Sequence, residues 1–160
     1  MESMRSALVK DTVVAVSTSG AAKLRGLSRF KQLILTLAVE SAERDSTDET
    51  YDIYVTTQGA GSRWDLVHFP QIVSTGAKTY VARVLSELLP QNVSTAGPGV
   101  PVVDSATVKT DTAGADQGVK TLGAGLVRHG PWGDVLGYEV VVGGTVVTGI
   151  KLSLYVEAIP

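Results

Sequence analysis

The feature that most constrains the fold is the alternation of apolar residues in residues 30–40, FKQLILTLAVE. Leucine or valine occupies every second position from residue 33 to 39, and successive side chains of a β-strand point to opposite faces of a sheet. The same period of two recurs in residues 51–58 and 146–156. The chain is therefore expected to contain long strands that each bury one face.

Turn signals between these segments predict how the strands are connected. A Gly-rich turn at 59–62 follows residues 51–58 and precedes an apolar segment around Trp64, which predicts a hairpin. The clearest predicted hairpin joins residues 138–142 to residues 146–156 through Gly143-Gly144. With residues 12–17 as a first strand and a strand after residue 78 that ends in a helical turn, the count is about eight.

No long helical pattern accompanies these strands, so the fold class is expected to be all-β, a β-sandwich or jelly roll. We expect one domain over residues 1–160, with an N-terminal arm over about residues 1–29. Residues 90–130 are rich in Gly, Pro, Ser, Thr and Asp and lack strong periodicity. This stretch is expected to be a long arm organised by contacts beyond the domain, and a mobile segment is the alternative.

The composition removes much enzyme chemistry. The sequence has no cysteine and two histidines, which leaves no thiolate nucleophile and argues against an imidazole-rich metal site. His68 is expected on the outer face or rim of the predicted hairpin, hydrogen-bonded to a neighbour, and His129 in an exposed turn. No serine lies in a G-x-S-x-G motif, and the acids show neither a glycosidase pair nor a calcium loop. We expect no catalytic residue, no cofactor and no metal.

Charge and aromatic placement identify the candidate interaction residues. Four cations, Lys23, Arg25, Arg29 and Lys31, lie within nine residues that contain no acid. They could meet an acidic partner surface or phosphates, and a solvated segment is the alternative. Trp132, in a Gly-Pro-Trp-Gly turn, is the aromatic expected to be open, and such a ring could stack on a sugar in a carbohydrate-binding adhesive module.

Several short motifs also occur in a fixed order along the chain. Their residues are Leu35, Leu37 and Val39; Asp52, Val55 and Gln58; Trp64, Asp65, Phe69 and Gln71; and Val142, Gly143, Gly144 and Thr145. Together these motifs resemble a family of small β-sandwich structural proteins of tailed bacteriophages, over about residues 30–85 and 137–157. The stretch near 90–130 is not covered and looks like an insertion.

The resemblance implies a virion component without catalytic activity. The first expectation is a capsid decoration (cement) protein, and the alternative is a head–tail or tail structural subunit. In such a protein Trp64 and Phe69 would anchor the core, Asp65 would cap a turn, and Gly143-Gly144 would provide the positive φ angles of a tight hairpin.

The implied partners are the major capsid protein and further copies of the chain, a trimer being favoured over a dimer. A mean hydropathy of +0.18 fits a surface that a partner covers. No direct nucleic-acid contact is expected at a net charge of −2. The sequence has no apolar run of signal-peptide length at its start and no apolar stretch of about 18 residues. We therefore expect no membrane contact. The resemblance implies synthesis in the host cytoplasm and a final location on the capsid surface.

Overall fold

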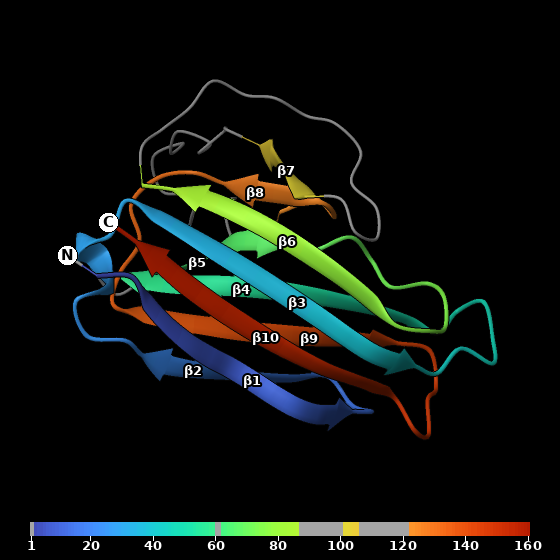
Figure 1. Cartoon of the computed structure of the whole chain (residues 1–160). Helices are drawn as coiled ribbons and strands as arrows, with labels where there is room; N and C mark the ends of the chain where they lie inside the picture. The colour runs from blue at the N-terminus through green and yellow to red at the C-terminus, as the bar shows by residue number, and fades with distance from the viewer. Residues whose placement is uncertain (1, 60–61, 87–100, 106–121) are drawn as a thin grey trace.

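A computed structural model describes residues 2–59, 62–86, 101–105 and 122–160. Within them the chain forms strands and one short 3-10 helix (Figure 1), and no helix is long and apolar enough to cross a membrane. The elements are β1 (Met4–Val14), β2 (Thr18–Lys23), η1 (Leu27–Arg29), β3 (Gln32–Ala42), β4 (Thr50–Gly59), β5 (Ser62–His68), β6 (Lys78–Leu85), β7 (Pro101–Ser105), β8 (Leu126–Arg128), β9 (Val135–Gly143) and β10 (Ile150–Ile159).

The strands form two layers, and the predicted all-β sandwich is confirmed. Sheet A has the antiparallel order β1-β10-β3-β6, and sheet B has the antiparallel order β8-β5-β4-β9-β2. In Figure 1 sheet A lies in front of sheet B. Strand β7 pairs in parallel with both β6 and β8, so it joins the two layers along one edge.

The core lies between the layers and follows the alternation of the sequence. In β3, Leu33, Leu35 and Leu37 are fully buried, while the residues between them are partly exposed. Strand β10 places its alternate residues from Ile150 to Ala158 on the same core. Phe69 is also fully buried, and Trp64 packs against the core from a partly buried position.

One predicted hairpin is confirmed and the other is wrong. Strands β4 and β5 pair directly, in a register that places Tyr54 opposite His68. Strand β9, however, pairs with β4 and β2 in sheet B, whereas β10 pairs with β1 and β3 in sheet A. The connection after Gly143 therefore crosses between layers, with a positive φ of 72° at Gly144. A period of two identifies the buried face of a strand but not its pairing partner, because both layers bury their inner faces in one core.

The predicted N-terminal arm is wrong for the residues that form β1 and β2. Strand β1 pairs with β10 at the edge of sheet A, and β2 pairs with β9 at the edge of sheet B. Register shifts on either side of Val9 interrupt the β1 ladder, which hides the period of two in the sequence. Buried Val9 and Val14 nevertheless fix this strand to the core.

The predicted arm over residues 90–130 is only partly within the described residues. Residues 101–105 form β7, and residues 122–130 belong to the sandwich, with Leu122 and Val127 buried. The prediction of an arm outside the domain is wrong for these two stretches, because both pack on or pair with β-strands of the core. Residues 87–100 and 106–121 lie outside the description, as does the helical turn expected after β6, which is itself confirmed as a strand.

Candidate functional site

The structure places the four predicted cations on one exposed segment, residues 23–31, called the basic segment below. Lys23, Arg25, Arg29 and Lys31 are all exposed. The segment runs from the end of β2 through η1 at one end of the sandwich, close to the chain termini (Figure 1). The structure thus exposes all four cations on one short segment.

Apolar and polar anchors hold the backbone of the basic segment. Leu27 and Phe30 are buried, so the charged residues between and beside them face solvent. Asp134 Oδ1 accepts the Ser28 N–H at 2.9 Å, and the Asp134 carbonyl accepts the Leu24 N–H at 2.7 Å. The Ser28 hydrogen bond lowers the pKa of the Asp134 carboxyl from its ordinary value. The segment is therefore fastened to the sandwich by an ionised carboxylate and by two core residues.

Trp132 is not the open aromatic predicted from its turn. The indole is 5% exposed, and its Nε1–H donates to the Leu27 carbonyl at 3.1 Å. A glycine- and proline-containing turn exposes its backbone, but a large ring beside it can still fold inward when a carbonyl satisfies its N–H. Trp132 thus supports the basic segment from beneath and offers no surface for a sugar ring.

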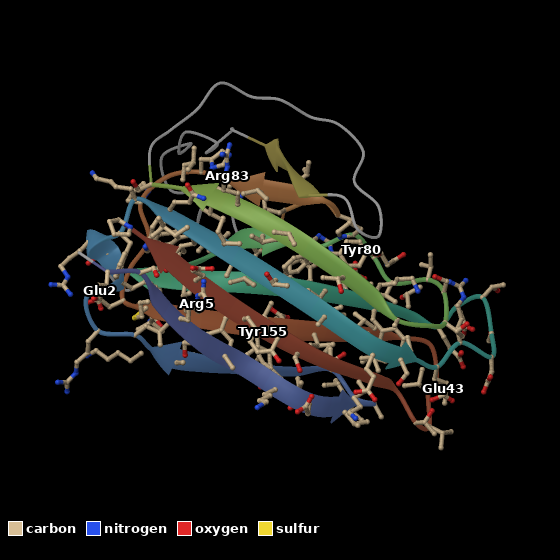
Figure 2. The ribbon with its side chains drawn as sticks, viewed as in Figure 1. Glu2, Arg5, Glu43, Tyr80, Arg83 and Tyr155 are labelled. Carbon is tan, nitrogen blue, oxygen red and sulfur yellow. The ribbon has the colours of Figure 1, made fainter. Side chains whose placement is uncertain are left out.

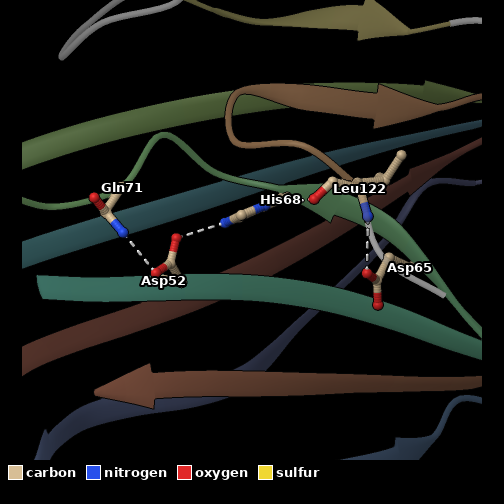
Figure 3. A network of polar contacts seen from close by, with 5 residues as sticks. All are labelled: Asp52, Asp65, His68, Gln71 and Leu122. Carbon is tan, nitrogen blue, oxygen red and sulfur yellow. Dashed lines mark hydrogen bonds and ion pairs between the residues drawn. The ribbon is translucent and has the colours of Figure 1, made fainter. Parts of the chain in front are cut away.

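A buried polar cluster lies on the outer side of sheet B, where residues before β8 cross β5 (Figure 3). His68 Nε2 lies 2.8 Å from Asp52 Oδ1, and His68 Nδ1 lies 2.7 Å from the Leu122 carbonyl oxygen. Gln71 donates to the other oxygen of Asp52 at 2.8 Å, and the ring of Tyr54 stacks on His68 with centroids 4.0 Å apart. The predicted hydrogen-bonded His68 on the outer face of the hairpin is confirmed.

In this geometry His68 links β4 to the segment before β8 through hydrogen-bonding contacts and does not act as a proton acceptor. A carbonyl oxygen only accepts hydrogen bonds, so Nδ1 donates to Leu122, and Nε2 faces a second acceptor in the Asp52 carboxylate. A general base needs a ring nitrogen with a free lone pair aimed at the substrate. Both nitrogens of His68 are engaged within the fold, and the ring is 5% exposed.

Asp65 binds the backbone N–H of Leu122, whose carbonyl is bound by His68. It lies within β5 instead of capping a turn, is 7% exposed, and accepts the Leu122 N–H at 3.2 Å. Burial raises the pKa of the Asp65 carboxyl to about 6, against the opposing effects of the Leu122 hydrogen bond and the Arg128 charge. The N–H and carbonyl of one residue, Leu122, are thus bound by Asp65 and His68.

The raised pKa of Asp65 predicts a pH-dependent effect of the variant Asp65→Asn. Between about pH 4 and pH 6 the folded carboxyl still binds a proton that the unfolded chain has lost, so Asp65 lowers the stability as pH rises through this window. Asparagine carries no such charge and can still accept the Leu122 N–H. Chemical unfolding across this range should therefore show Asp65→Asn becoming more stable relative to wild type, by about 2 kcal/mol in all.

Asp48→Asn provides a control of opposite sign. The Ser46 hydroxyl donates to exposed Asp48 and lowers the pKa of its carboxyl, so ionised Asp48 stabilises the fold as pH rises. Asp48→Asn should lose stability relative to wild type as pH rises toward 3.8, the ordinary pKa of the carboxyl, and should change no further above it. A difference between wild type and Asp65→Asn that does not change with pH would contradict the buried carboxylate described above.

The residues around β8 also differ from the expected exposed turn. His129 is fully buried, and its Nδ1 accepts the Leu85 N–H at 2.9 Å, so the prediction of an exposed His129 is wrong. Arg128 is 4% exposed and donates from Nη1 to the Asp65 carbonyl at 2.7 Å. These backbone partners come from β5 and β6, which no local sequence signal near residue 129 identifies.

A further polar site at the opposite end of the sandwich was not predicted. One oxygen of Glu43 accepts the N–H groups of Val147, Thr148 and Gly149 and the Thr148 hydroxyl. The Gly149 hydrogen bond contributes most to lowering the pKa of Glu43. The carboxylate fills this ring of donors, so the arrangement fastens the loop after β3 to the loop before β10.

Neither cluster has the composition of a metal centre. Among the described residues, no group of three or more His, Asp or Glu side chains is arranged to hold a metal ion. Comparison of the chain with known proteins finds no matching family model, no matching curated protein and no matching solved structure.

Proposed function

We propose that the protein is a virion structural protein, a capsid decoration protein that docks on an acidic surface of the assembled shell. The observation that carries this proposal is the exposed basic segment, which Leu27, Phe30 and Asp134 fasten to one end of a rigid sandwich. A surface held in this way loses little conformational entropy on binding. Bound to the assembled shell and not to free subunits, the protein would stabilise the shell by mass action.

The order of the strands supports the same proposal at the level of the fold. Eight strands pair in the orders β1-β10-β3-β6 and β2-β9-β4-β5, and we assign these interleaved orders to a jelly roll with β7 and β8 added at one edge. Jelly rolls occur in viral capsid proteins and in lectin domains. This is an analogy of fold, and the choice between such functions rests on the surface. Burial of Trp132 takes away the aromatic on which the carbohydrate-binding interpretation depended.

Binding to purified shells tests the proposal. The wild-type protein should co-sediment with shells assembled from a major capsid protein of the same genome, and added salt should weaken the binding because the attraction is electrostatic. Arg25→Glu, in the basic segment, should weaken binding by about tenfold, or 1.4 kcal/mol. Lys10→Glu changes the net charge equally at an exposed residue of β1 outside the segment, and it should bind as wild type does.

The outcomes separate the candidate roles. Binding to purified tails instead of shells would support the head–tail or tail alternative. Equal loss of shell binding in Arg25→Glu and Lys10→Glu would show that total charge matters and the basic segment does not. Absence of binding to either particle would overturn the proposal.

A further inference from the structure

The outer face of sheet A has an uncharged row of residues across its centre. The strand register aligns this row of outward residues across four strands. In the next row along, β10, β3 and β6 contribute uncharged residues, and Asp11 of β1 covers Ser153, which is 6% exposed. Outward faces of solvated antiparallel sheets are commonly polar, so an uncharged row with an exposed tyrosine at its middle is unusual. Figure 2 shows Tyr155 near the middle of this face. The two rows are Ala7, Tyr155, Thr36 and Val81, then Ser153, Ala38 and Thr79.

Ion pairs flank this centre at both ends. At one end Arg5 pairs with Glu157 at 2.9 Å, and at the other Lys151 pairs with Glu40 at 2.8 Å. An uncharged centre with a charged rim is the usual arrangement of a protein–protein interface. Lys151 and Glu157 both belong to β10, on either side of Ser153 and Tyr155, and their side chains are 37% and 30% exposed.

We propose that this face binds the same face of a second copy of the chain. A two-fold axis that crosses β10 at right angles between Ser153 and Tyr155 keeps each strand over its counterpart and reverses its direction. Lys151 of one copy then lies opposite Glu157 of the other, and the same contact repeats across the axis. The face is thus complementary to itself in charge, as an isologous interface requires.

The shape of the face agrees with this pairing. A shallow hollow beside Tyr155 is lined by Ile34, Thr36 and Glu157, among others. In the two-fold arrangement the Lys151 side chain of the second copy enters this hollow, with its stem on apolar atoms and its ammonium group at Glu157. Four charges of alternating sign then follow one another across the interface: Arg5, Glu157, and the second copy's Lys151 and Glu40.

Self-pairing of this face does not depend on the proposed function. The basic segment lies at the end of the sandwich, so the paired faces leave it exposed in both copies. An isologous face closes at two copies, which favours a dimer over the trimer expected from the sequence. A monomeric protein that binds shells would overturn the dimer alone, whereas a dimer that binds no particle would overturn the proposed function alone.

Sedimentation velocity of wild type and two variants tests the face. Wild type should sediment as a dimer, and Tyr155→Glu, which places a charge at the uncharged centre, as a monomer. Tyr155 is 38% exposed, so this variant should keep the fold, which circular dichroism checks. Val147→Glu also introduces a glutamate, at a residue that is 81% exposed outside the face, and should remain a dimer. A monomeric or trimeric wild type, or a dimeric Tyr155→Glu, would overturn the inference.

A charge swap tests the two-fold geometry itself. Lys151→Glu places two acids opposite each other at both ends of the interface, and Glu157→Lys places two bases there. Each variant alone should therefore be monomeric. Mixed in equal amounts they should form a heterodimer. Residues 151 and 157 are both acidic in Lys151→Glu and both basic in Glu157→Lys, so each of the two contacts across the axis then pairs an acid with a base. Failure of the mixture to associate, when each variant alone is folded, would contradict the proposed axis.

Discussion

Replacing Trp132 with alanine is expected to lower the free energy of unfolding by about 3–5 kcal/mol. The indole is almost fully buried and donates to the carbonyl of Leu27, itself fully buried in the basic segment. Truncation leaves a cavity beneath this segment and removes a buried hydrogen bond. Urea unfolding monitored by circular dichroism measures the loss.

Trp132→Phe separates the two contributions. Phenylalanine keeps most of the ring volume but cannot donate a hydrogen bond, and the Leu27 carbonyl retains its bond from the Phe30 N–H at 3.1 Å. Its cost should therefore be well below that of alanine. If Trp132→Ala changed stability no more than a typical surface substitution, within about 0.5 kcal/mol, the buried position would be contradicted and an exposed ring supported.

Replacing Gly149 with alanine is the second change expected to have a large effect, about 3 kcal/mol or more. The backbone here has a φ of 73°, and a Cβ atom would overlap the Val14 carbonyl oxygen. That oxygen belongs to the backbone of β1 and cannot rotate away. Any shift would also disturb the Gly149 N–H bond to Glu43 and the Glu43 N–H bond to the Gly149 carbonyl.

Gly76→Ala is the matched control for backbone strain. Gly76 also has a positive φ, of 93°, but a Cβ atom there would meet no atom within 4 Å. Its alanine variant should cost only the strain of the left-handed conformation, about 1–2 kcal/mol. Thermal unfolding of both variants measures the difference, and equal losses would contradict the close approach of Gly149 to β1.

The fold class could be predicted because it depends on a local pattern. Alternation in β3, β6 and β10 marks the buried face of each strand whatever its neighbour is, and all three strands occur as expected. Strand partners depend on contacts distant in the chain, so β9 and β10 suggested a hairpin although they lie in different sheets. The register shifts of β1 hide its alternation in the same way, so the sequence predicts an arm where the structure has an edge strand.

The candidate sites also differ in whether the sequence predicts them. The basic segment could be predicted because four neighbouring cations without an acid are rarely buried. Trp132 and His129 could not be placed, since Leu27 and Leu85, which satisfy their ring nitrogens, are far from them in sequence. The hold of Asp65 and His68 on Leu122 joins residues more than fifty positions apart, for which the sequence offered no signal.

The proposed function places the chain in a virion, bound to its shell. Quantitative mass spectrometry of gradient-purified particles, produced from the genome that encodes the chain, tests this proposal. The protein should be present in a constant ratio to the major capsid protein and should be released when high salt screens the basic segment. Purified, infectious particles that contain no copies of the protein would contradict it.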